Sequence, residues 1–211
     1  GRAPSHYGYG RNWTGAGSGT KRASFTSLPQ AFHLIAKWGA HSIIAEQYRV
    51  ASTRLLLMTA EKKHVVTLVA SSIMGEGKTT TAVNLAYVLA HDLKKSTLLI
   101  DCDFKRPMVH EYMDISVEPG LSEAMLGRDI LENCIHQYEG IPLSILPCGD
   151  SKVRPASISG IQYVKQILPE LRTRYDHVIL DGPPILTLAD VNVLGSLADQ
   201  VILVVRAGLT S

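Results

Sequence analysis

A short segment of this chain combines glycines with a lysine and a threonine in an order that suits phosphate binding. Gly75 lies two residues before Gly77, which is followed directly by Lys78 and Thr79. In the pattern G-x-x-x-x-G-K-[ST], backbone N–H groups surround phosphate oxygens, the lysine neutralises their charge and the hydroxyl binds Mg²⁺. Ser72 stands where the first glycine of that pattern belongs, so the strict pattern is missed by one residue. The residues predicted to contact a nucleoside triphosphate are Gly75, Glu76, Gly77, Lys78, Thr79 and Thr80.

The alternative is an ordinary turn at the two glycines, with Lys78 as a solvated surface charge. The flanking sequence argues against it. Residues 65–70 form a short, mostly β-branched run of the kind that makes a buried parallel strand. Residues 82–90 place Ala and Leu side chains on one helical stripe. A glycine-containing loop between a buried strand and a helix favours the phosphate site.

Three carboxylates follow predicted strands. Asp101 and Asp103 end the apolar run 97–100, and Asp181 ends the run 178–180. The carboxyl ends of parallel strands meet at one edge, so we expect all three acids beside the phosphate loop. Mg²⁺ prefers oxygen ligands, which predicts a metal site of Thr79, Asp101 and Asp181. Asp103 is then a candidate base, although any one of these acids could instead cap a turn or a helix.

The rest of the chain continues the alternation of strands and helices. Further strands are expected at 143–147 and 201–205, and helices at 42–55, 161–175 and 188–197. Near-continuous apolar strands separated by helices predict an α/β fold with a mostly parallel sheet, covered by helices on both faces.

Composition excludes little but sets limits. The chain has 211 residues, 45% of them hydrophobic, and a formal net charge of +2. That length fits one domain with flanking segments, and that charge gives no reason to expect nucleic acid as a partner. Cys102, Cys134 and Cys148 have no metal-ligand spacing and suggest reduced thiols. No apolar run approaches the roughly 18 residues of a membrane span, so we expect a cytoplasmic domain.

Two regions differ in composition. Residues 1–41 are predicted to be a flexible leader, because their Gly- and Ser-rich first 30 residues show no helical or strand period. Residues 42–211 are predicted to form the nucleotide-binding domain. The chain begins with Gly1 and ends six residues after the last predicted strand, so we expect a fragment truncated at its C-terminus.

The sequence resembles the bacterial tyrosine kinases of exopolysaccharide and capsule assembly over most of residues 42–211. The segment 71–79 looks like the Walker A stretch of that family, 98–107 like its second acidic motif, and 178–184 like its Walker B motif. The resemblance implies a P-loop NTPase (Rossmann-like) three-layer fold. It implies ATP and Mg²⁺ as cofactors and γ-phosphoryl transfer to protein tyrosines, including those of the kinase itself. By the same resemblance, Lys78, Asp101, Asp103 and Asp181 are catalytic.

The chain departs from the family at several positions. The second acidic motif usually has Arg where this chain has Lys105, with Arg106 following. A family helix used in ring assembly carries Glu-x-x-Arg-x-x-Arg; Glu46 and Arg49 match it, but Ser52 takes the third position. The resemblance therefore leaves two interpretations of Glu46 and Arg49, a homo-oligomer contact or an exposed i,i+3 pair.

Partners and acceptors follow from the resemblance alone. It implies a membrane-embedded polysaccharide chain-length regulator as activator, and hence a location at the inner face of the plasma membrane. The tyrosine cluster at the C-terminus of family members is absent from these residues. Only Tyr7 and Tyr9 lie close together, in the leader, as acceptors or as linker aromatics.

Two other functions compete. Partitioning and division-site ATPases of the same superfamily carry a signature lysine five residues before the P-loop lysine, where this chain has Ile73. The second is a nucleotide-binding regulatory domain without transferase activity. Intact Lys78 and Thr79 with the three carboxylates argue against it.

Overall fold

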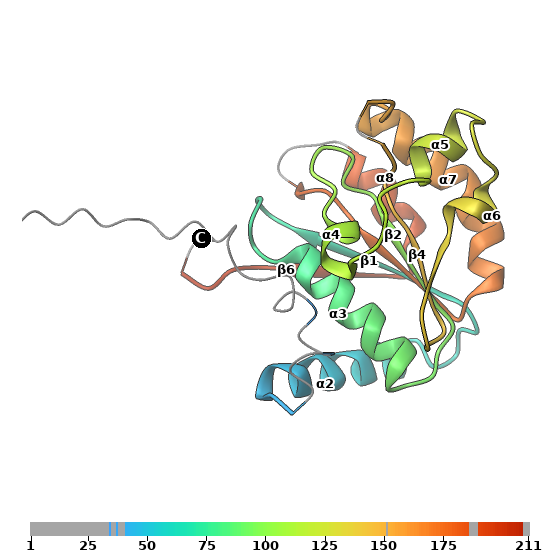
Figure 1. Cartoon of the computed structure of the whole chain (residues 1–211). Helices are drawn as coiled ribbons and strands as arrows, with labels where there is room; N and C mark the ends of the chain where they lie inside the picture. The colour runs from blue at the N-terminus through green and yellow to red at the C-terminus, as the bar shows by residue number, and fades with distance from the viewer. Residues whose placement is uncertain (1–33, 35–36, 38–40, 151, 186–189, 209–211) are drawn as a thin grey trace, which may run out of the picture.

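The computed structural model describes residues 34, 37, 41–150, 152–185 and 190–208. Within them, a six-stranded sheet lies between two layers of helices, as Figure 1 shows. The predicted α/β fold is confirmed.

The sheet has the strand order β3-β4-β2-β5-β1-β6. All its pairs are parallel except β3 with β4, which is antiparallel. The sheet is therefore mostly parallel, as predicted. The three-residue edge strand β3 was not predicted from the sequence. The strands are β1 (Val65–Ser71), β2 (Thr97–Asp101), β3 (His136–Tyr138), β4 (Leu143–Leu146), β5 (His177–Asp181) and β6 (Gln200–Val204).

The two faces of the sheet have separate cores. One contains Leu68, Leu98 and Leu180 and is covered by α5 to α8; the other contains Leu99 and Ile179 and is covered by α2 to α4. Every residue of β1, β2 and β5 is buried, which explains their continuous apolar sequences. The helices are α2 (Ile43–Met58), α3 (Lys78–His91), α4 (Val109–Met113), α5 (Leu121–Met125), α6 (Leu131–Cys134), α7 (Ser157–Arg174) and α8 (Asp190–Leu197).

Most predicted element boundaries agree within a few residues. The helix predicted from residue 42 is α2, whose N-cap Ser42 accepts a hydrogen bond from the Ala45 amide. Helix α7 begins earlier than predicted, and the predicted start of α8 falls in residues 186–189, outside the described residues. Helices α4 to α6 were not predicted, because four or five residues are too few to show a helical period.

Packing against the domain begins before residue 42. Leu34 is 2% exposed and belongs to the core under α3, and the Lys37 ammonium donates to the Tyr138 hydroxyl at 2.7 Å. The predicted boundary at residue 42 followed only the helical pattern and did not take these two residues into account. Tyr7, Tyr9 and most of the predicted leader lie outside the described residues.

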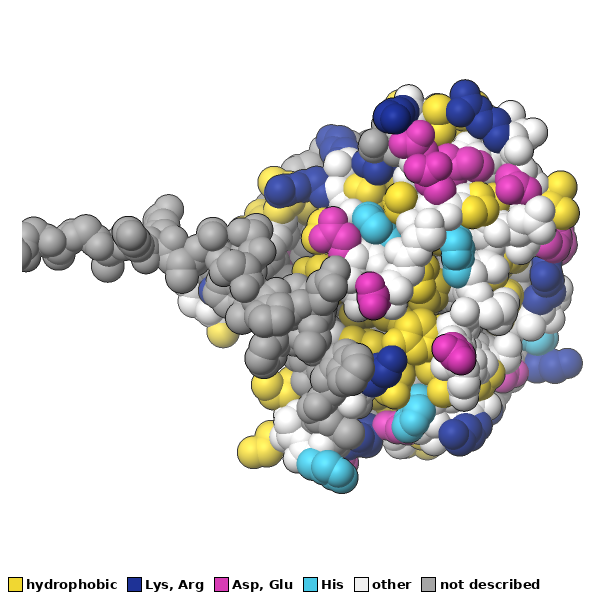
Figure 2. All heavy atoms as spheres, viewed as in Figure 1, with side chains coloured by type: hydrophobic (Ala, Val, Ile, Leu, Met, Phe, Trp, Pro, Cys, Tyr) yellow, Lys and Arg dark blue, Asp and Glu magenta, His cyan; other side chains and the backbone are white. Residues whose placement is uncertain are grey.

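Charge is mixed over the visible surface. In Figure 2, Lys and Arg side chains are interspersed with Asp and Glu over this face rather than gathered into one patch. Among the described helices, none is long and apolar enough to cross a membrane.

Candidate active site

The loop between β1 and α3 has the backbone that its glycines allow. Gly75 has φ +85° and Gly77 φ +97°, both in the left-handed region that favours glycine. A Cβ at either position would meet nothing within 4 Å, so backbone conformation and not crowding requires glycine there. Gly77 is the N-cap residue of α3. The loop therefore leads directly into a helix N-terminus, whose first N–H groups have no partner within the helix.

The Glu76 side chain stabilises this loop through hydrogen bonds to backbone amides. Its Oε2 accepts the Ile73 amide at 3.0 Å and its Oε1 accepts the Arg206 amide at 3.4 Å. Glu76 was predicted as a nucleotide contact, but its buried carboxylate is engaged by the backbone around the loop. The predicted contact of Glu76 with nucleotide is therefore assigned to its backbone N–H.

Three successive threonines tie the start of α3 to three other elements. The Thr79 hydroxyl donates to Asp181 Oδ2 of β5 at 2.7 Å. Burial raises the pKa of Tyr112 in α4 and of Tyr48 in α2, against the lowering effects of side-chain hydrogen bonds from Thr80 and Thr81. Sequence reasoning missed both tyrosines, since nothing in their spacing relates them to the loop.

Lys78 lies among the predicted acids. Its Nζ is 2.8 Å from Asp103 Oδ2 and 3.8 Å from Asp181 Oδ1, and its side chain is 10% exposed. Burial works to lower the pKa of Lys78, but the charges of Asp181 and Asp103 outweigh it and raise that pKa. The lysine is therefore a fixed positive charge at the carboxyl ends of β2 and β5, which excludes the solvated surface alternative.

The carboxylates of Asp101 and Asp181 are in register on neighbouring strands and fully buried. Burial, and then the charge of Asp181, raise the pKa of Asp101 to about 7. Burial likewise raises the pKa of Asp181 to about 6, against the lowering effects of Lys78 and of the Thr79 hydrogen bond. Two like charges share this space, so neither is ionised as readily as an ordinary carboxylate.

Asp101 has a different environment from its neighbours. Its Oδ1 accepts the Asp103 amide and its Oδ2 accepts the Val109 amide, both at 3.1 Å. Val109 is the first residue of α4. The capping alternative therefore applies to Asp101, whose two oxygens are both engaged by backbone.

Asp181 keeps one oxygen for another partner. Its Oδ1 is buried and accepts no hydrogen bond. In the described part of the chain, no three His, Cys, Asp or Glu side chains are grouped so as to hold a metal by themselves. A magnesium ion beside Thr79 and Asp181 would take its remaining ligands from phosphate and water, as Mg²⁺ commonly does.

Comparison with known proteins gives this arrangement a family. A model described as an AAA domain matches residues 65–211. The tyrosine-protein kinase YwqD of Bacillus subtilis (strain 168) is 34% identical over 178 residues, which span 84% of this chain and 75% of YwqD. The chain belongs to the bacterial tyrosine-protein kinases. The tyrosine-protein kinase etk of Escherichia coli (strain K12) is 30% identical over 79% of this chain, but the match spans only 23% of etk.

Solved structures agree with this assignment. The kinase domain of Escherichia coli tyrosine kinase ETK superposes with a TM-score of 0.77 at 26% identity, covering 91% of this chain and 73% of that one. The VpsO kinase domain gives a TM-score of 0.69 at 32% identity, covering 81% and 87%. The septum site-determining protein MinD of Pyrococcus horikoshii OT3, solved with Mg-ADP, gives 0.57 at 24% identity and shares the fold alone. The kinase therefore has a P-loop nucleotide-binding fold, and the ATPase switch is not favoured.

Glu46 and Arg49 lie apart from this site. The Arg49 guanidinium bridges Glu46 at 3.0 Å and Asp92, at the C-cap of α3, at 2.8 Å. The i,i+3 pair is therefore present, as one part of a link between α2 and α3.

Proposed function

We propose that this kinase transfers the γ-phosphoryl group of ATP, bound with Mg²⁺, to tyrosine hydroxyls, its own included. The observation that supports this most strongly is the position of the Lys78 ammonium between Asp103 and Asp181, where the phosphate loop meets α3. Phosphoryl transfer requires mainly positioning and stabilisation of negative charge, and these residues supply both.

The residues present fit ATP and magnesium. Gly75 and Gly77 leave the loop open, so backbone N–H groups of residues 75–80 can approach phosphate oxygens. The Thr79 hydroxyl and Asp181 Oδ1, which accepts no hydrogen bond and faces Lys78 at 3.8 Å, are hard oxygen donors of the kind that Mg²⁺ prefers. Magnesium, when bound, neutralises phosphate charge. Thr79 and Asp181 would bind the magnesium ion directly. Asp101, next to Asp181 on the neighbouring strand, would contribute through its negative charge.

Asp103 is the proposed base. Its Oδ2 faces the Lys78 ammonium, which in this role binds the phosphoryl group, so a tyrosine hydroxyl attacking that group would come close to Asp103. The carboxylate would then accept the hydroxyl proton as the oxygen–phosphorus bond forms. The alternative role of Asp103, as a metal ligand, predicts a different kinetic effect: Asp103→Asn would then weaken Mg-ATP binding as much as it slows transfer.

Labelled ATP tests the proposal. Purified protein is incubated with Mg²⁺ and γ-labelled ATP, and label is followed both on tyrosine and as free phosphate. We expect phosphotyrosine from the wild type and almost none from Lys78→Met. Since Lys78→Met leaves Asp103 and Asp181 without their cation, Lys78→Arg is the matched variant that keeps the charge and the fold. Phosphate release without phosphotyrosine, also from protein mixed with its membrane activator, would contradict the kinase role.

The cellular role rests on family resemblance. The kinase would regulate exopolysaccharide or capsule polymerisation and export, at the inner face of the plasma membrane. Its partner would be a membrane-embedded chain-length regulator, supplied as a fused or a separate protein. Co-purification of the kinase with such a regulator, and loss of polymer length control in the Lys78→Met strain, test this role.

A homo-oligomer through α2 is part of the same proposal. Glu46 is 60% exposed as a side chain, so it can reach a neighbouring copy, whereas Arg49 would have to share its contacts with Asp92. Light scattering of the wild type and of Glu46→Ala would test it, since an assembly that forms through α2 loses mass in the variant.

A further inference from the structure

A tight turn after Asp103 brings a guanidinium to the phosphate loop. The Arg106 amide donates to the Asp103 side chain at 3.0 Å and to the Asp103 carbonyl at 3.1 Å. From this turn the Arg106 side chain reaches Met74 in the phosphate loop, with Nη1 3.9 Å from Sδ. The backbone of Arg106 is thus fixed by the same carboxylate that holds Lys78.

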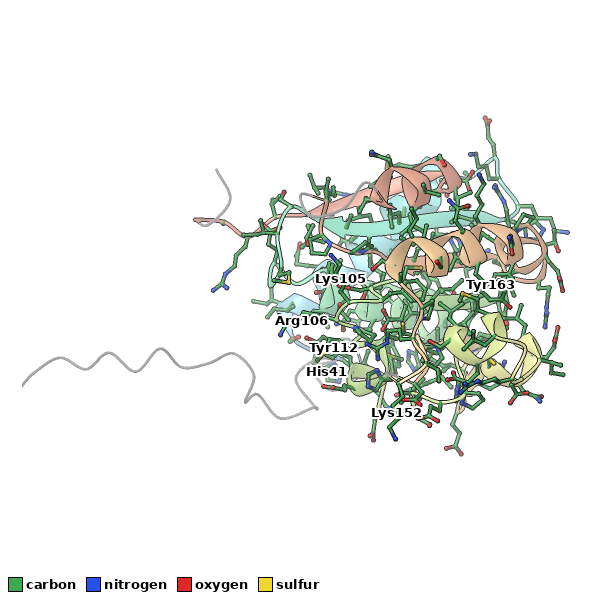
Figure 3. All side chains as sticks on the ribbon, turned by 90° about the horizontal axis from the view of Figure 1, so that it is seen from above. His41, Lys105, Arg106, Tyr112, Lys152 and Tyr163 are labelled. Carbon is green, nitrogen blue, oxygen red and sulfur yellow. The ribbon has the colours of Figure 1, made fainter. Side chains whose placement is uncertain are left out.

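The neighbouring cation behaves differently. Lys105 is also exposed, and Figure 3 shows it with Arg106 and Tyr112 at one end of the molecule, away from Tyr163. Within the described residues, however, the Lys105 side chain makes no hydrogen bond or ion pair. Of these two adjacent cations, Arg106 is the one whose side chain hydrogen-bonds to a described residue of the phosphate loop.

The present contact of Arg106 is easy to replace. A thioether is a weak acceptor, and the guanidinium is exposed, so moving from Met74 to a phosphate oxygen would break no strong interaction. A guanidinium also binds two oxygens of one phosphoryl group with its planar fork, which an ammonium cannot do.

We propose that Arg106 contacts the γ-phosphoryl group and stabilises its charge during transfer, and that Lys105 does not. This inference rests on the proposed function. In the step concerned, a bond forms between the tyrosine oxygen and the γ-phosphorus, and the bond from that phosphorus to the β,γ-bridging oxygen breaks. ADP leaves with the electron pair, and the tyrosine proton goes to Asp103. Arg106 and Lys78 then provide positive charge from two different elements, the turn after β2 and the first turn of α3.

The test compares neighbouring variants. Arg106→Ala should lower kcat by about 100-fold or more, the effect expected when one charge-stabilising group is removed, with little change in the affinity for ATP. Arg106→Lys should restore only part of that loss, because it lacks the fork. Lys105→Ala, the matched control, should stay close to the wild type.

A binding measurement separates a phosphoryl contact from a role in the turn. The affinities of wild type and variants for ADP alone and for ADP with fluoroaluminate, which imitates the transferring group, are measured by calorimetry. We expect Arg106→Ala to weaken only the fluoroaluminate complex. Equal weakening of both complexes, or no weakening in either, would overturn the proposal, as would an equal effect of Lys105→Ala.

The outcome is distinguishable from a failure of the proposed function. If the wild type transfers no phosphate to tyrosine, the kinase proposal fails, but the fluoroaluminate measurement still decides whether Arg106 contacts the γ-position. If the wild type is active and Arg106→Ala equals it, only the Arg106 proposal fails.

Discussion

Strand β1 has a carboxylate near each of its ends, partly buried Asp199 and fully buried Asp181, and the two have different surroundings. At the start of the strand, Asp199 accepts the Val66 amide at 2.8 Å, Arg172 at 2.9 Å and Lys62 at 2.7 Å. At the other end, Asp181 accepts one short hydrogen bond, from Thr79, and its Oδ1 accepts none.

The pKa shifts follow from these surroundings. Burial works to raise the pKa of Asp199, but the hydrogen bonds from Lys62 and Val66 and the charge of Arg172 bring it below its ordinary value. Burial prevails at Asp181 and raises its pKa to about 6. Folding therefore favours the ionised form of Asp199. It disfavours the ionised form of Asp181, at a cost to stability that a bound cation would offset.

Asp181→Asn should give the largest effect on activity. The amide keeps an acceptor for the Thr79 hydroxyl but removes the charge that would hold magnesium. We expect phosphotyrosine formation to fall by about 100-fold or more. The free energy of unfolding should not fall, since a buried charge with a raised pKa is removed. Labelled-ATP assays and urea unfolding on the same preparation check both outcomes.

The same substitution at the other end of β1 provides the second prediction. Asp199→Asn should lower the free energy of unfolding by about 1 to 2 kcal/mol. The loss is limited to this range because solvent screens the Arg172 and Lys62 side chains, which are 38% and 49% exposed. Kinase activity should stay near that of the wild type. If Asp199→Asn impaired transfer more than stability, the division between the two ends would be wrong.

The pH dependence gives a control for Asp199. Because its pKa is lower in the folded protein than in the unfolded chain, its contribution is present above the ordinary value of about 4 and is lost as the pH falls through the folded-state value. The difference in unfolding free energy between wild type and Asp199→Asn should therefore be full at pH 7 and shrink towards zero in acid. A difference that persisted in acid would show that packing, not charge, was lost.

The contrast between the two ends was only partly predictable. Apolar runs ending in Asp101 and Asp181 predicted the sheet and the edge at which the acids meet, because parallel topology alone brings strand ends together. The sequence could not tell which acid the backbone would engage. Asp101 accepts the Val109 amide because the chain after β2 turns back towards the end of that strand. No local sequence pattern predicts this contact.

Side-chain direction was the other missing information. Glu76 and Arg106 lie in motifs in which several adjacent residues could contact a ligand. In the structure, the Glu76 carboxylate accepts a backbone amide of the phosphate loop, and the Arg106 guanidinium contacts Met74. Those directions depend on the turn conformations at Gly75 and after Asp103, which composition and period do not encode.

Lys62→Ala should give the smallest effect and show which contact of Asp199 matters. The ammonium is half exposed, and removing it leaves the Val66 amide and Arg172 on the carboxylate. We expect a loss of about 0.5 kcal/mol or less, which should decrease further as salt is added. Urea unfolding at low and high salt measures it. A loss as large as that of Asp199→Asn would mean that the exposed ion pair, and not the part-buried bonds from Val66 and Arg172, stabilises this end of the strand.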